Sequence, residues 1–179
     1  MVSKNLLIGS SIIINMIKNI KKLKIAIIGL GYVGLPLAIA FAKKRKIIGF
    51  DISKNRIKQL KSKIDLNLEI KSNEFRNTNN ILFTRSKKDL KSANCFIITV
   101  PTPIDNKNLP DLKNLKQSSK MIAKIMKKDS LVIYESTVYP GCIEEDCVPV
   151  IEKFSGLKFN KDFFCGYSPE RINPGDKKH

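Results

Sequence analysis

The feature that most constrains the fold is a Gly-x-Gly-x-x-Gly pattern at residues 29–34, which lies between a short apolar run and an Ala- and Leu-rich stretch. A β-rich run before such glycines and a helical pattern after them predict a strand, a tight turn and the start of a helix. Gly29 would allow the turn, Gly31 would let a pyrophosphate approach the bare backbone, and Gly34 would let the helix pack closely on the strand. The free N–H groups at the helix start favour phosphate groups. The pattern therefore predicts a dinucleotide site lined by Gly29, Leu30, Gly31, Tyr32, Val33 and Gly34.

Asp51 indicates which dinucleotide is bound. It ends a second β-rich run, residues 46–50, about 20 residues after the glycines, where a ribose-binding acid is expected. A carboxylate accepts hydrogen bonds from a ribose 2′-OH and repels a 2′-phosphate, which favours NAD over NADP. Asp51 could instead cap the next helix, but the two roles are compatible and Ser53 is the stronger cap candidate. Arg56, one turn into that helix, either reaches the adenosine side or is solvated.

The length and the cysteines limit the class of protein. A chain of 179 residues with 42% hydrophobic residues can bury one sizeable core, so we expect one domain. Its cysteines form no Cys-x-x-Cys pair and have no spacing suited to zinc, so we expect no metal site. Because a nucleotide-binding fold is typical of the reducing cytoplasm, we expect a cytoplasmic protein whose thiols are free. The four cysteines are Cys95, Cys142, Cys147 and Cys165.

The net charge of +17 has two interpretations. Lysine-rich runs could form a polyanion-binding surface. They could equally reflect a composition rich in Lys, Ile and Asn throughout. Because aromatic residues are not interleaved with the basic runs, we do not expect nucleic-acid binding. The charge still favours a polyanionic substrate or cofactor.

Residues 1–22 precede the predicted domain, which occupies residues 23–179. The apolar stretch at residues 5–17 is short for a membrane span and carries two asparagines, and no small-x-small cleavage site follows it. We therefore expect an N-terminal extension, with Met16 as the genuine start, rather than a membrane anchor.

The rest of the chain alternates strand and helix patterns. We predict strands at residues 24–28, 46–50, 81–84, 94–100, 131–135 and 163–167. We predict helices at residues 32–44, 54–63, 112–127 (capped by Asp111) and 143–154, with short helices near 73–76 and 87–91. This alternation predicts an α/β fold with a doubly wound parallel sheet, a Rossmann-like domain whose ligands gather at the carboxyl ends of the strands.

Three loops at that edge carry polar groups. They are residues 100–103, with the Thr102 hydroxyl between two prolines, residues 135–141, with Ser136 and Thr137, and residues 167–171. Ser, Thr, Pro and Gly are also ordinary turn residues. All three loops, however, lie on the edge where the glycine loop would place NAD.

Four motifs closely resemble the UDP-glucose/GDP-mannose dehydrogenase family. They are Gly-Leu-Gly-Tyr-Val-Gly-Leu-Pro (29–36), Val-Pro-Thr-Pro (100–103), Glu-Ser-Thr-Val-Tyr-Pro-Gly (135–141) and Tyr-Ser-Pro-Glu-Arg-Ile-Asn-Pro-Gly-Asp (167–176). The resemblance runs from about Lys24 to the last residue. It is greatest to the bacterial branch that oxidises UDP-N-acetylhexosamines at C6, the UDP-GlcNAc/UDP-GalNAc 6-dehydrogenases of the Vi polysaccharide type, which serve surface polysaccharide biosynthesis.

This resemblance implies two successive NAD-dependent oxidations, from alcohol through aldehyde to acid, by way of a cysteine thioester. It implies that Thr137 positions a catalytic water, that Glu170 assists acid–base chemistry and thioester hydrolysis, and that Arg171 contacts the sugar nucleotide. From the residues alone, Glu170 could simply pair with Arg171. The residues implied to hold NAD are Gly29, Gly31, Gly34, Asp51, Arg56, Pro101, Thr102, Ser136 and Thr137.

Family members are more than twice as long, and in them the nucleophilic cysteine, its Lys, Asn and Asp partners, a long dimerising helix and a UDP-binding domain would follow His179. None of the four cysteines matches that nucleophile. We therefore expect the NAD-binding portion of a homo-oligomeric enzyme, inactive alone. The alternatives are a stand-alone NAD-binding module, half of a split enzyme, or a UDP-glucose 6-dehydrogenase. The Ser-Pro-Glu-Arg loop argues against a β-hydroxyacid-type dehydrogenase.

Overall fold

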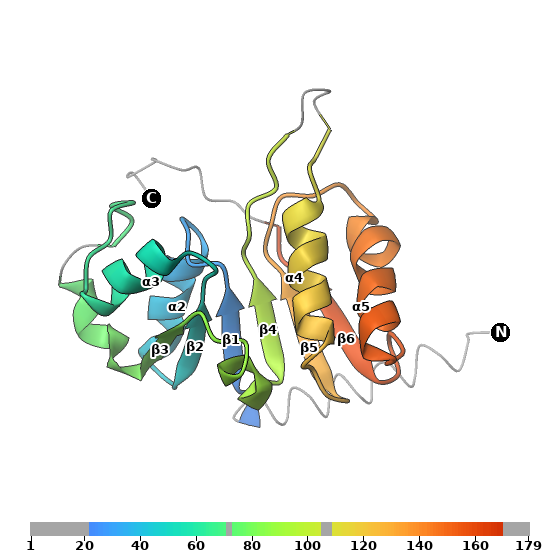
Figure 1. The fold of residues 1–179 in the computed structure, drawn as a ribbon, viewed down its shortest axis with the longest axis horizontal. Coiled ribbons are helices and arrows are strands. Elements are labelled where there is room, and N and C mark those ends of the chain that lie inside the picture. The colour runs from blue at the N-terminus through green and yellow to red at the C-terminus, as the bar shows by residue number, and fades with distance from the viewer. Residues whose placement is uncertain (1–21, 71–72, 105–108, 170–179) are drawn as a thin grey trace.

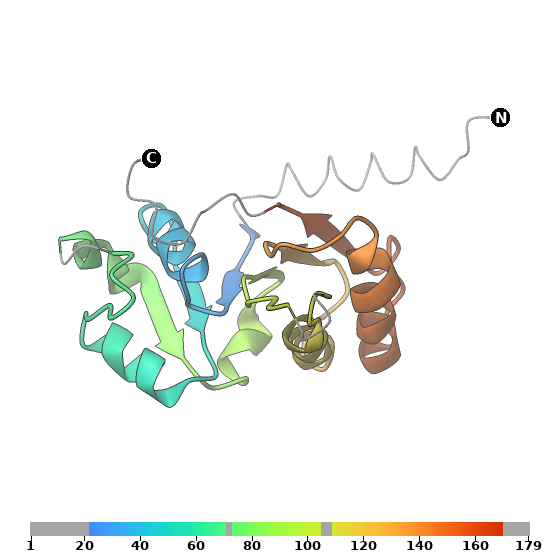
Figure 2. The same cartoon turned by 90° about the horizontal axis from the view of Figure 1, so that it is seen from above.

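A six-stranded, wholly parallel sheet organises the chain, with helices on both of its faces (Figures 1 and 2). The computed structural model describes residues 22–70, 73–104 and 109–169. The strand order is β3-β2-β1-β4-β5-β6. The strands are β1 (Ile25–Ile28), β2 (Ile47–Phe50), β3 (Ile81–Thr84), β4 (Cys95–Ile98), β5 (Ser130–Tyr134) and β6 (Phe163–Tyr167).

The helical elements fall into two sets that cover opposite faces. One face packs against α2 (Gly34–Ala42), α3 (Lys54–Lys61) and the 3₁₀ segment η2 (Glu74–Asn80). The other packs against the 3₁₀ segment η3 (Asp89–Ser92), α4 (Lys113–Ala123), the π-helical turn η4 (Ile143–Cys147) and α5 (Val148–Ser155). No described helix is long and apolar enough to cross a membrane.

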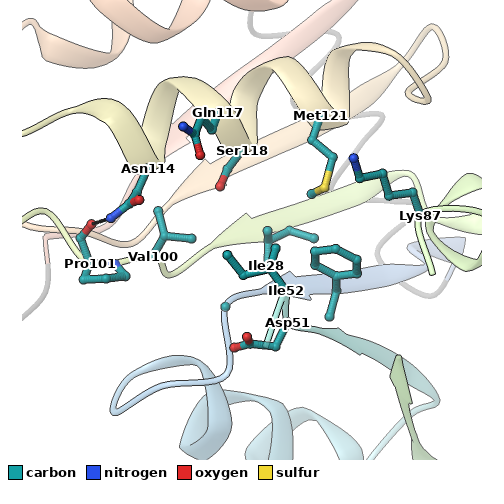
Figure 3. Close-up of a pocket in the computed structure, with 12 residues that line it drawn as sticks. Ile28, Asp51, Ile52, Lys87, Val100, Pro101, Asn114, Gln117, Ser118 and Met121 are labelled. Carbon is teal, nitrogen blue, oxygen red and sulfur yellow. Dashed lines mark hydrogen bonds between the residues drawn. The ribbon is translucent and has the colours of Figure 1, made fainter. Parts of the chain in front are cut away.

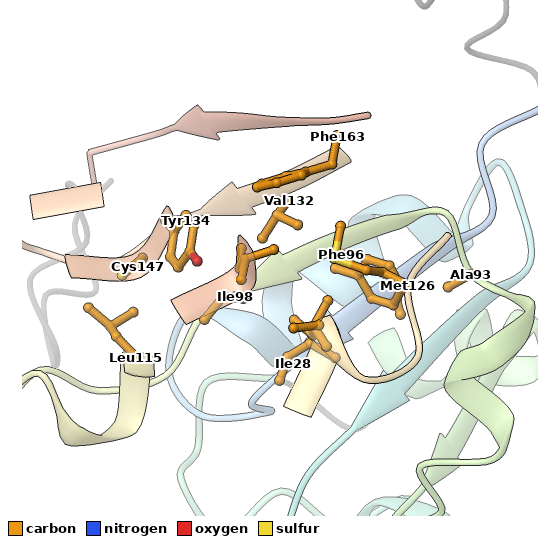
Figure 4. Packing of buried hydrophobic residues seen from close by; sticks show 14 of the residues in the cluster. Ile28, Ala93, Phe96, Ile98, Leu115, Met126, Val132, Tyr134, Cys147 and Phe163 are labelled. Carbon is orange, nitrogen blue, oxygen red and sulfur yellow. The ribbon is translucent and has the colours of Figure 1, made fainter. Parts of the chain in front are cut away.

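The alternation of side chains along each strand divides the core between these two faces. On β1, Ile25 and Ile27 join the cluster under α2 and α3, while Ala26 and Ile28 join the cluster under α4 and α5. Figure 4 shows the second cluster, where Phe96 and Tyr134 are fully buried. A parallel sheet buried on both faces needs apolar residues at nearly every strand position, as this sequence has. Each such large apolar side chain contributes roughly 1.5–3 kcal/mol on burial.

The chain reverses its direction of winding between β1 and β4. It proceeds from β1 to β2 and β3 on one side, then returns to β4 beside β1 and continues to β5 and β6 on the other side. At such a switch point the loops after the two neighbouring strands diverge, which leaves a crevice at the carboxyl ends. The fold therefore positions a site between the loops after β1 and β4.

The predicted α/β class and all six strands are confirmed. The predicted helix over residues 143–154 is instead two elements, because a π-helical turn precedes α5 and Pro149 lies in the first turn of α5. Asp111 is not the N-cap of α4, a position that Leu112 takes. Its carboxylate instead accepts a hydrogen bond from the Lys113 N–H at 2.9 Å. Ser53 is confirmed as the cap of α3, since its hydroxyl accepts the Arg56 N–H at 3.2 Å. Apart from Lys22, the predicted extension lies outside the described residues.

Candidate cofactor-binding site

The three glycines of the loop after β1 are required for different reasons. Gly29 has a φ of +98°, which L side chains rarely adopt, and its N–H donates to the Phe50 carbonyl at 2.8 Å. A Cβ on Gly34 would lie 1.9 Å from the Gly29 oxygen and 2.4 Å from Thr99 Oγ1, so α2 can pack this closely only with glycine there. A Cβ on Gly31 would meet no atom within 4 Å. The backbone at Gly31 thus faces open space beside the start of α2, as a site for pyrophosphate requires.

Asp51 lies at the end of β2 and is bonded directly to the glycine loop. Its Oδ2 accepts the Leu30 N–H at 2.9 Å, and its Oδ1 accepts the Ser53 N–H at 2.8 Å. A carboxylate offers about four acceptor positions, so two remain for ribose hydroxyls. The half-buried carboxylate therefore both shapes the loop and fits the predicted ribose contact.

The remaining loop residues differ in exposure. Leu30 is fully buried, Tyr32 is exposed, and Val33 is half-buried at the N-cap of α2, where it makes no side-chain cap bond. Arg56 is not solvated. It is 9% exposed, and its Nε donates to the Leu30 carbonyl at 2.7 Å.

A cavity of about 430 Å³ opens at the switch point between β1 and β4 (Figure 3). This volume falls within the usual range for small-molecule sites, roughly 300–1,000 Å³. The predicted residues Gly29, Asp51 and Pro101 line it. The opposite wall was not predicted from the sequence. It comes from α4, which contributes Asn114, Gln117, Ser118 and Met121. Their spacing, i, i+3, i+4 and i+7, places them on one face of the helix, but this spacing alone does not show what the face contacts.

The loops after β4 and β5 are bonded to each other. Thr102 donates its hydroxyl to the Thr137 carbonyl at 2.8 Å, and Ser136 donates its hydroxyl to the Val100 carbonyl at 2.8 Å. Ser136 is buried, whereas Thr137 is exposed. The structure thus brings three of the predicted residues together on one edge. Glu170 and Arg171 lie outside the described residues.

The four thiols are free and their chemistry is suppressed by burial. Desolvation raises the pKa of Cys95 and of Cys147 to about 11 and that of Cys165 to about 12. Burial also raises the pKa of Cys142. A thiol with a raised pKa carries little thiolate at neutral pH, so these cysteines act as small apolar residues. Among the described residues, no group of three or more acidic, Cys or His side chains could hold a metal ion.

The doubly wound sheet, the glycine loop, Asp51 and the cavity at the switch point together define a Rossmann-type dinucleotide-binding domain. Residues 23–179 match the NAD-binding domain of the UDP-glucose/GDP-mannose dehydrogenase family, and the chain belongs to this family. The predicted family and the NAD cofactor are thereby confirmed.

The similar proteins include enzymes of the predicted branch. The chain is 59% identical over 159 residues to the UDP-N-acetyl-D-glucosamine 6-dehydrogenase of Pseudomonas aeruginosa, a match that covers 89% of this chain and 38% of that enzyme. It is 53% identical to the enzyme of the same name from Salmonella typhi, over 89% and 38% of the two chains. The solved structure of UDP-D-ManNAc dehydrogenase from Pyrococcus horikoshii superposes with a TM-score of 0.75 at 36% identity, over 86% of this chain and 37% of that one. The chain thus spans less than two fifths of the length of these relatives.

Proposed function

We propose that the chain supplies the cofactor-binding part of a dehydrogenase that oxidises C6 of a UDP-N-acetylhexosamine to the uronic acid for surface polysaccharide biosynthesis. The observation that carries this proposal is the 59% identity to a UDP-N-acetyl-D-glucosamine 6-dehydrogenase over nearly all of the matched domain. The alternative substrate is UDP-glucose, which would make the whole enzyme a UDP-glucose 6-dehydrogenase. The rest of the active site would come from the segments that follow this domain in the relatives, in a homo-oligomer. The cofactor and the free thiols favour the cytoplasm.

Each part of the edge has a role in this proposal. NAD, when bound, accepts a hydride in each of two oxidations. The Asp51 carboxylate would accept the ribose hydroxyls, and the open backbone at Gly31 with the first turn of α2 would hold the pyrophosphate. Thr102, Ser136 and Pro101 would line the nicotinamide side. Thr137 would orient a water for thioester hydrolysis.

Two predicted residues beyond the described part of the chain complete the proposal. Glu170 would take and return the protons that the two oxidations and the hydrolysis move, a task suited to a carboxylate near substrate. Arg171 would contact the sugar nucleotide, as a guanidinium suits phosphate.

Calorimetry with NAD and NADP on the 179-residue protein tests the cofactor assignment. We expect NAD to bind more tightly, because the Asp51 carboxylate would repel the 2′-phosphate of NADP. The titrations are run at physiological salt, where the net charge of +17 attracts the additional phosphate less strongly. Equal affinities, or a preference for NADP, would contradict the role of Asp51.

A chimera tests the oxidation. Residues 23–179 replace the matching segment of the Pseudomonas aeruginosa relative, and NADH formation is measured with UDP-GlcNAc, UDP-GalNAc and UDP-glucose. We expect NADH from an N-acetylhexosamine substrate. The same chimera with Gly31→Val is the matched control and should be inactive. A folded chimera that binds NAD but oxidises none of the three substrates would contradict the proposed oxidation and support the alternative of a stand-alone NAD-binding module.

A further inference from the structure

A buried ion pair lies directly behind the glycine loop. Arg56 Nη1 and Asp65 Oδ1 are 2.6 Å apart, and the two side chains are 10% and 0% exposed. Every other ion pair between described residues that the structure shows has at least one partner that is much more exposed. Burying two charges carries a desolvation cost that their attraction often fails to offset, so a pair like this is weak evidence for stability. The role of the Arg56–Asp65 pair is therefore better read from the backbone groups that the two side chains contact.

Asp65 is held in place by the chain that follows it. Its Oδ1 also accepts the Asn67 N–H at 3.2 Å, and its Oδ2 accepts the N–H groups of Glu69 and Ile70 at 2.9 and 3.0 Å. Three backbone donors and one guanidinium thus surround a single carboxylate. Because these bonds fix the Asp65 carboxylate, the carboxylate in turn fixes the position of the Arg56 guanidinium.

Arg56, held by Asp65, contacts the glycine loop directly. Its Nε donates to the Leu30 carbonyl at 2.7 Å, while the Leu30 N–H donates to Asp51 Oδ2 at 2.9 Å. Both polar groups of the Leu30 backbone are therefore bonded, one to each charged side chain. The next residue is Gly31, where an added Cβ would meet no atom within 4 Å.

The guanidinium is also covered. Arg56 Nη2 is buried, and it has no hydrogen-bond partner among the described residues. Because the group is enclosed, Arg56 acts on a bound dinucleotide through the Leu30 backbone rather than from an open surface.

We propose that Asp65 is a positioning residue for the dinucleotide site: it holds Arg56, which fixes the Leu30 carbonyl and so presets the glycine loop for the pyrophosphate. The inference deepens the proposed function, since it assumes that NAD binds at this loop. A loop already in its binding conformation loses less freedom when the ligand arrives, which is the physical basis of the expected gain in affinity.

The first test compares NAD dissociation constants by calorimetry on the full 179-residue protein. Asp65→Asn keeps the size of the side chain but removes its charge, and we expect NAD to bind about tenfold more weakly. Asp162→Asn is the matched control, because Asp162 pairs with Lys128 at 3.1 Å at the opposite end of the sheet and should leave the constant unchanged. If the unaltered protein fails to bind NAD, the proposed function fails. If it binds and Asp65→Asn binds equally well, only the present inference fails.

A second variant separates positioning from stability. Removing one charge of a buried pair is strongly destabilising, whereas replacing both with neutral groups is often tolerated. The double variant Arg56→Met/Asp65→Asn should therefore unfold at a higher urea concentration than Asp65→Asn alone. It should still bind NAD about tenfold more weakly, because the Leu30 carbonyl has lost its donor. A stable double variant with unaltered NAD affinity would overturn the inference.

The amide resonance of Gly31 provides a spectroscopic readout, because its peptide bond contains the Leu30 carbonyl. We expect this resonance to shift in the ¹⁵N–¹H spectrum of Asp65→Asn without ligand, although Asp65 contacts the loop only through Arg56. In Asp162→Asn it should stay in place. A Gly31 resonance that is unmoved by Asp65→Asn would show that the ion pair serves only the loop at residues 65–70.

Discussion

The two halves of the sheet prepare their ligand edges in different ways. In the glycine-loop half, β1 to β3 with α2 and α3, charged side chains hold the backbone, as Asp51 and Arg56 hold Leu30. In the hydroxyl half, β4 to β6 with α4 and α5, hydroxyl groups bond to the backbone of the neighbouring loop, as Thr102 and Ser136 do. The cavity lies between the two halves, because both line it, whereas the glycine loop with its open space at Gly31 belongs to the first half. The domain alone should therefore owe its NAD affinity mainly to the glycine-loop half.

The largest expected effect is that of Gly34→Ala on folding. The added Cβ would lie 1.9 Å from the Gly29 carbonyl oxygen, so α2 must move away from β1. We expect a loss of about 3 kcal/mol in the free energy of unfolding, at the upper end for overpacking. Urea denaturation measures it, with Gly31→Ala as the control, since a Cβ there meets nothing within 4 Å. Equal stabilities of the two variants would contradict the close packing of the helix on the strand.

Gly31→Val should abolish NAD binding without unfolding the domain. The side chain would occupy the space that the pyrophosphate needs, while no protein atom obstructs it. Calorimetry should show no binding, and the free energy of unfolding should change by about 0.5 kcal/mol or less. An intact circular dichroism spectrum together with unchanged NAD affinity would place the phosphates elsewhere.

Asp51→Ala tests the glycine-loop half, where charged side chains hold the backbone. Hydrogen bonds to a charged group contribute roughly 1.5–3 kcal/mol, so NAD binding should weaken by about that amount. Asp51→Asn should lose less, because the amide oxygen still accepts a hydrogen bond. Both changes should reduce the difference between the affinities for NAD and for NADP, since the charge that repels the 2′-phosphate is gone. An Asp51→Ala protein that keeps its preference for NAD would remove Asp51 from the ribose site.

Ser136→Ala tests the hydroxyl half. Its hydroxyl is the buried donor to the Val100 carbonyl, and leaving that acceptor without a partner should cost about 1 kcal/mol of folding free energy. Calorimetry should find a much smaller loss of NAD affinity than Asp51→Ala causes, because Ser136 would only line the nicotinamide side. A loss of affinity as large as that of Asp51→Ala would end the distinction between the two halves.

The sequence predicted those parts of the site where a residue type is imposed by local geometry. The turn at Gly29, the close approach at Gly34 and the acid at the end of β2 each leave a fixed spacing in the chain. The α4 wall of the cavity was missed because polar residues on a helix are ordinary until packing shows what they face. Asp65 was missed because its partner Arg56 lies nine positions earlier, across the end of α3 and a left-handed backbone at Lys63, a path that no periodicity describes.

The smallest expected effect concerns Asp146, which ties the hydroxyl half together. Its carboxylate pairs with Lys116 of α4 at 2.7 Å and accepts the Tyr139 hydroxyl from the loop after β5. The hydrogen bond from Lys116, followed by that from Tyr139, lowers the pKa of Asp146 below its ordinary 3.8. A carboxyl whose pKa is lower in the folded state stabilises the fold above its unfolded pKa, and loses that contribution as the pH falls through the folded value.

Asp146→Asn should therefore cost only about 0.2–1 kcal/mol at neutral pH, because Lys116 is exposed and Asp146 is half-buried at the surface. The difference between the variant and the unaltered protein should disappear in urea titrations well below pH 3.8. A difference that persists there would mean that Asp146 acts through its shape rather than its charge. If NAD affinity falls together with stability at neutral pH, the loop after β5 contributes more to cofactor binding than its hydroxyl contacts indicate, and the two halves are less independent than the structure suggests.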